Sequence, residues 1–109
     1  MAWLVTDARV LASAEVADTG KARSRGLLGR RGLDGALVLR PCHWVHTLGM
    51  KFALDIAFLD SEGKVIRIVQ MRRHRMGLPV PRAHSVIEAE AGAFARWGLE
   101  VGAVVEIRE

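Results

Sequence analysis

Two strand-like runs of residues on either side of a turn constrain this chain more than any other feature. The first run places an apolar residue at every second position, at Phe52, Leu54, Ile56 and Phe58. A cluster of turn-forming residues follows at Asp60–Gly63, and Val65–Met71 is then rich in β-branched residues. Two such runs around a short turn predict a β-hairpin.

Shorter segments predict further strands on both sides of this hairpin. Apolar residues alternate with others over Arg9–Val16, and Ala36–Leu39 is a short apolar run closed by Pro41. Ser85–Ala89 and Val101–Ile107 are expected to be strands as well. Several short strands separated by turn signals are typical of a β-sandwich or barrel.

Helices are expected to be few and short. Asp18 and Thr19 are favourable N-cap residues, so we expect a short helix over Gly20–Leu28 that stops at Gly29. Ala91–Arg96 is either one helical turn or a loop. A parallel βαβ architecture needs helices between its strands, and they are missing from this pattern. The sequence therefore predicts a mainly β, compact, single-domain sandwich or barrel-like fold over residues 1–109, with one or two short helices.

The composition is that of one globular domain. The chain has 109 residues, of which 50% are hydrophobic and 26% are charged. A single cysteine excludes an internal disulfide framework. No uncharged apolar stretch approaches the ~20 residues of a membrane helix. The apolar run Ala2–Val5 meets Asp7 almost at once, so we expect no signal peptide. These features favour a soluble, cytoplasmic protein with no membrane partner.

The positive charge gathers in two clusters. Lysine and arginine outnumber aspartate and glutamate by 16 to 12, a formal net charge of +4. One cluster lies within Lys21–Arg31 and the other, Arg72–Arg75, begins the long loop Arg72–Arg82. A basic surface can attract phosphates or an acidic protein, or it can be no more than a solvated face. Neither cluster contains an aromatic residue for base stacking, which argues against nucleic acid as the partner.

Three segments carry a family resemblance. Residues 23–30 (RSRGLLGR) are similar to the element R-x-x-G-L-M-G-R, residues 46–60 (HTLGMKFALDIAFLD) to the signature H-T-F-G-M-R-F-P-I-D-V-V-F-L-D, and residues 83–92 (AHSVIEAEAG) to A-x-x-V-L-E-L-x-A-G. With Gly102 as a late glycine, the chain resembles the family called domain of unknown function 192 over about residues 14–107. The resemblance implies a compact, mostly β sandwich or barrel and supplies no activity.

The chain departs from that family's pattern at three positions. Ala53 stands where the family usually has proline, and Leu28 stands where it has methionine. Ala103 stands where an aspartate usually follows the glycine. The resemblance therefore assigns no role to a proline turn or to that aspartate in this chain.

The central block of the resemblance suggests a ligand pocket. Trp44, Met50 and Phe52 are large and apolar, and His46 and Thr47 lie among them in the sequence. Apolar walls with a few polar anchors describe a small-molecule site, and they equally describe a core with one hydrogen-bonded histidine. An arginine could neutralise the charge of an anionic ligand. The candidate ligand-binding residues are Arg23, Arg30, Trp44, His46, Thr47, Met50 and Asp55.

Asp55 interrupts an otherwise apolar run. Alternation places it opposite the large apolar residues of the predicted strand, beside Ala53 and Ala57, which leave space next to it. A carboxylate in such a position must be hydrated, paired or protonated. It is either a polar anchor in a pocket or a structural group held by an ion pair or turn hydrogen bonds. The cationic partners considered for it are Arg23, Arg30, His46 and Lys51.

Two kinds of chemical site are considered for Cys42, His43 and His46. Thiolate and imidazole are zinc ligands, but on a strand Cys42 and His46 would lie ~13 Å apart at ~3.3 Å per residue. Cys42 could instead be a nucleophile with His46 or His84 as its base, which requires a lowered thiol pKa. The sequence shows no helix start that would lower it. We therefore expect a small, buried Cys42, no metal and no cofactor.

Three functions remain open at this point. The first is a non-enzymatic binding module for a small anionic molecule, with a pocket around Trp44, His46 and Asp55. The second is a small hydrolase or isomerase that uses His46 and Asp55 as acid and base. The third is a domain that binds an acidic protein or a nucleic acid through the basic loop Arg72–Arg75. The sequence identifies neither the ligand nor the oligomeric state.

Overall fold

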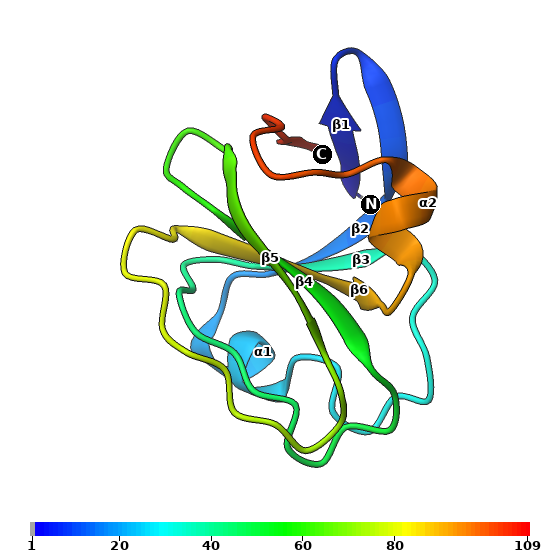
Figure 1. Ribbon diagram of the computed structural model, residues 1–109, viewed down its shortest axis with the longest axis vertical. Coiled ribbons are helices and arrows are strands. Elements are labelled where there is room, and N and C mark those ends of the chain that lie inside the picture. Colours follow the sequence, from blue (N-terminus) through cyan, green and yellow to red (C-terminus); the bar gives the residue numbers. More distant parts are fainter. Residues whose placement is uncertain (1) are drawn as a thin grey trace.

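The computed structural model describes residues 2–109, which form seven strands and two short helices (Figure 1). In chain order these elements are β1 (Ala2–Thr6), β2 (Arg9–Ala17), α1 (Gly20–Arg25), β3 (Ala36–Leu39), β4 (Leu54–Leu59), β5 (Val65–Met71), β6 (Ser85–Glu90), α2 (Ala93–Trp97) and β7 (Glu106–Arg108). No helix in this part of the chain is long and apolar enough to cross a membrane.

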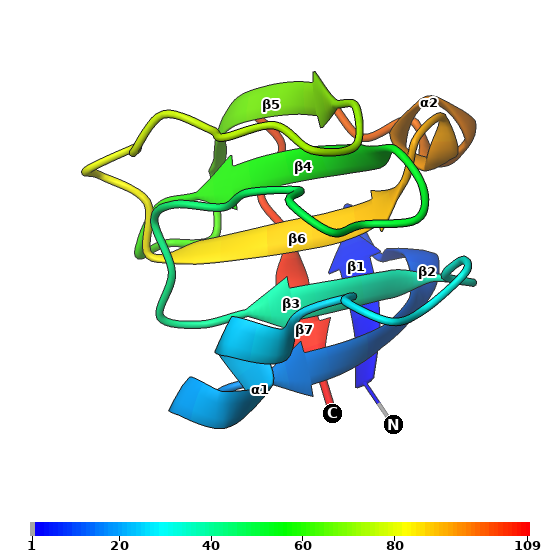
Figure 2. The ribbon, with the colours of Figure 1, turned by 90° about the horizontal axis from the view of Figure 1, so that it is seen from below.

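All seven strands join one curled sheet that forms a half-barrel. The strand order is β5-β4-β6-β3-β2-β1-β7, so β5 and β7 are the edges (Figure 2). The mainly β prediction is thus confirmed. One connection differs from expectation, because β2 and β3 pair in parallel and α1 lies between them in the chain. A single parallel pair needs only this one crossover, so the helix-poor pattern still permits it.

The predicted hairpin is the β4–β5 pair. Its register places Leu54 opposite Met71, Ile56 opposite Val69 and Phe58 opposite Arg67. Because β4 also pairs with β6 on its other side, all six of its residues are buried. The strand with the clearest alternation therefore lies inside the sheet, next to its β5 edge.

Alternate residues of β4 belong to two hydrophobic cores, which lie on opposite faces of the sheet. Ala57 and Leu59 join a core that includes Phe94 of α2. Leu54, Ile56 and Phe58 join a second core, against which the turn after α1 packs through Leu27. The two helices accordingly lie on opposite sides of the sheet (Figure 1). Polar side chains that point to opposite faces of the sheet therefore cannot contact each other.

Three local predictions need correction. The helix α1 begins as expected, since the side chain of Thr19 accepts a hydrogen bond from the Ala22 N–H, but it ends at Arg25. The next residue, Gly26, has a φ of 49°, which side-chain-bearing residues rarely adopt, so the helix stops before Leu28. The last strand begins at Glu106, not at Val101. The strand β1 was not predicted, and it forms by pairing with both β2 and β7.

Candidate functional site

A cavity of about 310 Å³ opens on the face of the sheet that carries α1. Its walls come from α1 and the turn after it, from the segment 41–46, and from single residues of β3 and β6. Leu27, Leu39 and Met50 supply apolar wall and belong to the second core. Arg23 and Glu88 bring opposite charge types to the same space.

Trp44 and His46 form an aromatic side of the cavity. The indole N–H of Trp44 donates to the carbonyl of Gly77 at 2.8 Å, which fixes the ring. The two ring centroids lie 5.5 Å apart with a tilt of 50°. Nδ1 of His46 accepts a hydrogen bond from the Leu48 N–H at 3.2 Å. A neutral His46 ring therefore carries its proton on Nε2, which is then a hydrogen-bond donor.

Arg23 is held in place through neutral partners. Its Nη1 donates to the carbonyls of Asp18 and Arg40, at 2.9 and 3.2 Å. None of the salt bridges found among residues 2–109 includes Arg23. Two carbonyl contacts orient the guanidinium without neutralising its charge, so the charge stays available to a ligand.

Glu88 is the most unusual titratable group at the cavity. It belongs to β6, is only 5% exposed, and lies opposite Ile56 and Leu37 in the sheet register. Its carboxyl takes part in none of the hydrogen bonds or salt bridges found among residues 2–109, and no fully buried side-chain oxygen there lacks a partner. The small exposed part of Glu88 therefore reaches the cavity. Burial raises the pKa of Glu88 to about 7.

Cys42 also borders the cavity and is half-buried. Its thiol donates to the carbonyl of Trp44 at 3.2 Å. Burial is the main cause that raises the pKa of the Cys42 thiol, so the thiol form prevails and a nucleophilic thiolate is disfavoured. Residues 2–109 contain no group of three or more His, Cys, Asp or Glu side chains placed to hold a metal ion.

Four of the seven candidate residues meet at this cavity, namely Arg23, Trp44, His46 and Met50. Arg30 does not, because both of its Nη atoms donate to the carboxylate of Glu15, at 2.6 and 3.0 Å. Thr47 does not either. It is fully buried, and its hydroxyl donates to the Arg72 carbonyl and accepts from the Arg75 N–H. Thr47 thus holds the basic loop against the body of the protein.

Asp55 lies away from the cavity, on the opposite face of β4. Its Oδ2 accepts from the N–H groups of Gly92 and Phe94, at 2.9 and 3.1 Å, where α2 begins. Its Oδ1 accepts from the side-chain amide of Gln70 at 3.0 Å. Asp55 thus makes hydrogen bonds within the fold, and none of the cationic partners considered for it is used. The structure does not bring His46 and Asp55 together.

The sequence reasoning missed Glu88. An acidic residue interrupts the apolar strand β6 just as Asp55 interrupts β4, so the same signal was present. Alternation places Glu88 on the face of Val86, and Val86 belongs to the core beside the cavity.

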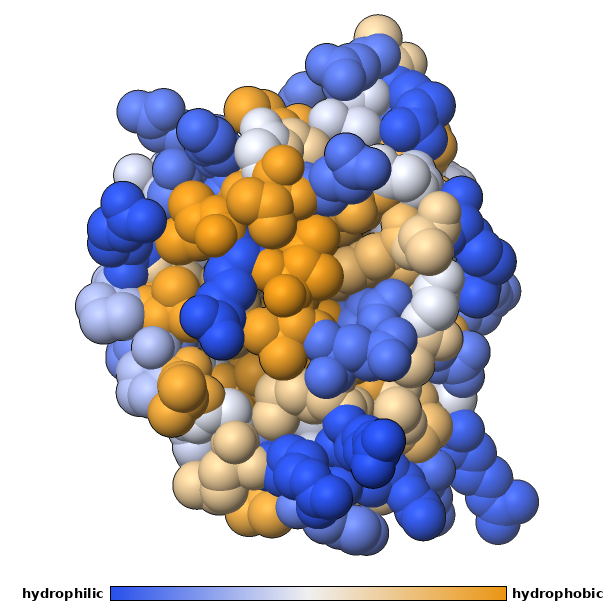
Figure 3. All heavy atoms as spheres, in the orientation of Figure 1, coloured by the Kyte–Doolittle hydropathy of each residue, from blue (hydrophilic) through white to orange (hydrophobic). Residues whose placement is uncertain are grey.

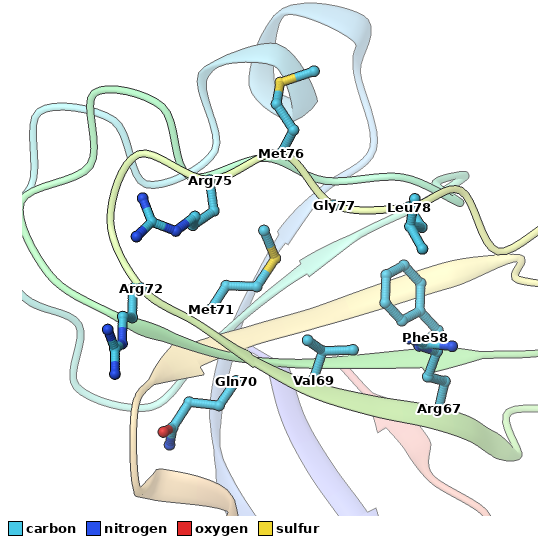
Figure 4. Close-up of a pocket in the computed structure, with 10 residues that line it drawn as sticks. All are labelled: Phe58, Arg67, Val69, Gln70, Met71, Arg72, Arg75, Met76, Gly77 and Leu78. Atoms are coloured by element: carbon cyan, nitrogen blue, oxygen red, sulfur yellow. The ribbon is translucent and has the colours of Figure 1, made fainter.

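A second hollow, a groove of about 460 Å³, lies between β5 and the loop that follows it (Figure 4). Its charged side chains are arginines and its floor is apolar. It contains no histidine, cysteine or carboxylate, so the smaller cavity is the better candidate for a site with acid–base character.

Comparisons with known proteins give a family and a fold. The family model DUF192, described as "Uncharacterized ACR", matches residues 3–107. No curated protein matches the chain. A protein of unknown function from Novosphingobium aromaticivorans DSM 12444 is similar, with a TM-score of 0.81 at 22% identity over 96% of this chain and 82% of the other. A protein from Sinorhizobium meliloti 1021, described as a candidate transcription regulator, gives a TM-score of 0.82 at 22% identity over 97% and 91%. Identity this low shows the shared fold alone.

Proposed function

The chain belongs to the DUF192 family, and from this premise we propose that it is a non-enzymatic binding module for a small anionic molecule. The ligand occupies the cavity lined by Arg23, Trp44, His46 and Glu88. The volume of about 310 Å³ is at the small end of ligand pockets, which suits a carboxylate, a sulfate or phosphate, or a sugar acid. We also propose that this binding takes place in the cytoplasm, where a lone cysteine stays reduced.

One observation carries the proposal: Arg23 and Glu88 share one cavity, and neither is part of a salt bridge among residues 2–109. Arg23 supplies a charge that is already oriented. Protonated Glu88 can donate a hydrogen bond to a ligand oxygen, whereas ionised Glu88 would repel an anion. Because the pKa of Glu88 is raised to about 7, both forms are populated near neutral pH.

The other charged or titratable groups at the cavity favour an anion as well. Arg25 and His46 are basic, and Cys42 keeps its proton because burial raises its pKa. Trp44 and Met50 offer apolar contact to the uncharged part of a ligand. Apolar walls that surround a few polar anchors are the usual design of a small-molecule site.

A hydrolase or isomerase built on His46 and Asp55 is less well supported. Such an enzyme needs both groups at one substrate, directly or through one water. Asp55 instead accepts hydrogen bonds from α2 on the far face of β4. We therefore prefer binding to acid–base catalysis by this pair.

Titration calorimetry with sulfate, acetate, succinate and glucuronate at pH 6 tests the proposal. We expect saturable binding of at least one of these anions. Arg23→Gln should weaken it at least tenfold, because the oriented charge is lost. Arg31→Gln removes the same charge from an exposed position outside the cavity and should leave the affinity unchanged. Absence of saturable binding across the panel would contradict the proposal.

A further inference from the structure

The groove beside β5 has an apolar floor and a basic rim. Phe58, Val69 and Met71 project from β4 and β5 toward the loop that carries Leu78 (Figure 4). The basic rim consists of three arginines, Arg67, Arg72 and Arg75. None of them takes part in a salt bridge among the described residues. Their charges are therefore free to meet an acidic partner.

The same groove lies at an open edge of the sheet. The strand β5 pairs with β4 on one side only (Figure 2). Its first residue, Val65, is covered, because its N–H donates to the Ala103 carbonyl and its own carbonyl accepts from the Gly102 N–H. Within residues 2–109, positions 66–71 make no backbone hydrogen bond other than those with β4. Six residues of strand edge thus keep backbone groups that another strand can pair with.

The half-buried side chains of this edge are apolar, and its two exposed side chains are Arg67 and Gln70. Ile66, Ile68 and Val69 are only half-buried, and Leu78 and Met76 are 74% and 62% exposed. Figure 3, which views the molecule from the side of β5, shows apolar side chains gathered at the centre of that face with polar ones around them. An exposed apolar strand edge without a partner is a costly feature for a free protein, and it is the usual feature of a strand-accepting surface.

We propose that β5 and its groove bind an extended segment of a partner protein in which acidic and apolar residues alternate. The segment pairs with the backbone of residues 66–71 as an eighth strand. Its alternate side chains then point to one face, as strand geometry requires. Apolar side chains enter the groove against Val69, Met71 and Leu78. The acidic side chains of such a segment point to the other face of β5, the side on which Figure 4 shows Gln70 and Arg72.

Charge favours an acidic strand over two other occupants of the groove, a second copy of the chain and a nucleic acid. A second copy of the chain paired through β5 would bring two sets of Arg67, Arg72 and Arg75 together, and like charges in contact are unfavourable. A nucleic acid suits the arginines but not the floor, where Phe58 is the only aromatic residue and aliphatic or methionine side chains prevail. An acidic, partly apolar strand satisfies both the rim and the floor.

Fluorescence anisotropy with a labelled eight-residue peptide of alternating Glu and Val tests this proposal on the whole protein. We expect saturable binding, and at least tenfold weaker binding of the peptide that has Lys in place of Glu. The double variant Arg72→Glu, Arg75→Glu and the single variant Leu78→Asp should each weaken binding at least tenfold. Arg31→Glu, an exposed charge reversal away from the groove, is the control and should bind as the wild type does.

Hydrogen exchange adds a readout that is specific to strand pairing. Amides of residues 66–71 that face away from β4 should exchange slowly only when the Glu–Val peptide is bound. Arg23→Gln must leave peptide binding intact, which separates this surface from the anion cavity. No saturable peptide binding, an unchanged exchange rate at 66–71, dimerisation of the free protein that Leu78→Asp abolishes, or tighter binding of a single-stranded oligonucleotide than of the peptide would each overturn the proposal.

Discussion

The Oε1 atom of Glu88 lies 3.7 Å from the position that a β-carbon would occupy on Gly26. The turn that ends α1 therefore packs directly against the buried carboxyl of β6. Gly26 serves two purposes at once: its φ of 49° stops the helix, and its missing side chain leaves Glu88 open to the cavity. The first of these purposes can be tested through stability.

Gly26→Ala should lower the free energy of unfolding by about 1–2 kcal/mol, because an alanine is strained at this positive φ. Urea denaturation measures the loss. Gly20→Ala is the matched control, since Gly20 opens the same helix without a positive φ and its added β-carbon would meet only the Arg23 side chain at 3.9 Å. Equal stability of both variants would show that the turn does not require glycine.

Glu88 should make the stability of the protein depend on pH. Burial raises its pKa from 4.5 to about 7, so between these values the folded state holds a proton that the unfolded state releases. The free energy of unfolding should therefore fall as the pH rises from 4.5 to 7, by on the order of 3 kcal/mol, and stay level above that range. Denaturation curves of the wild type and of Glu88→Gln check this. The glutamine variant should have the shallower slope, and identical slopes would refute a buried, titrating Glu88.

Asp55 should act on stability and not on anion binding. Asp55→Ala leaves the N–H groups of Gly92 and Phe94 without their acceptor at the start of α2, which should cost about 3 kcal/mol. Asp55→Asn keeps an oxygen for these donors and should cost clearly less. Denaturation and sulfate titration of both variants separate the two roles. A variant that is as stable as the wild type but no longer binds the anion would contradict this prediction and show that Asp55 takes part in anion binding.

Thr47 should control the position of the basic loop. Thr47→Val retains the shape of the side chain but removes the hydroxyl that joins the Arg72 carbonyl and the Arg75 N–H, at a cost of about 1–2 kcal/mol. Thr47→Ser keeps the hydroxyl and is the control. Amide exchange at residues 72–76 should be faster in the valine variant alone. Unchanged exchange there would mean that other contacts fix the loop.

The sheet could be predicted where a local pattern suffices. Period-2 alternation predicted β4, because β4 separates two cores and each face selects its own residues. The turn at Asp60–Gly63 and the β-branched residues after it predicted β5. The strand β1 escaped prediction, since the turn that joins it to β2 contains neither glycine nor asparagine, although Asp7 and Ala8 both have positive φ values. The early end of α1 followed from the φ of Gly26, which composition does not reveal.

The geometry of the candidate site followed only in part from the sequence, again because packing between distant segments decides it. Alternation shows that Asp55 points away from the large apolar residues of β4 and that Glu88 points to the same face as Val86. It does not show what each carboxyl group meets on that face. Asp55 meets two backbone N–H groups of α2, and Glu88 meets an open cavity. The difference arises from packing between distant segments, so similar sequence signals give a structural residue in one strand and a candidate binding residue in the other.

The most direct measurement is the affinity for sulfate at pH 6 and pH 8, since sulfate keeps its charge over this range. If the protonated form of Glu88 binds the anion, its pKa of about 7 predicts roughly tenfold weaker binding by the wild type at pH 8. Glu88→Gln, which cannot ionise, should lose most of this difference. The same pH dependence in the wild type and in Glu88→Gln, or stronger binding at pH 8, would contradict an anion site built on Arg23 and Glu88.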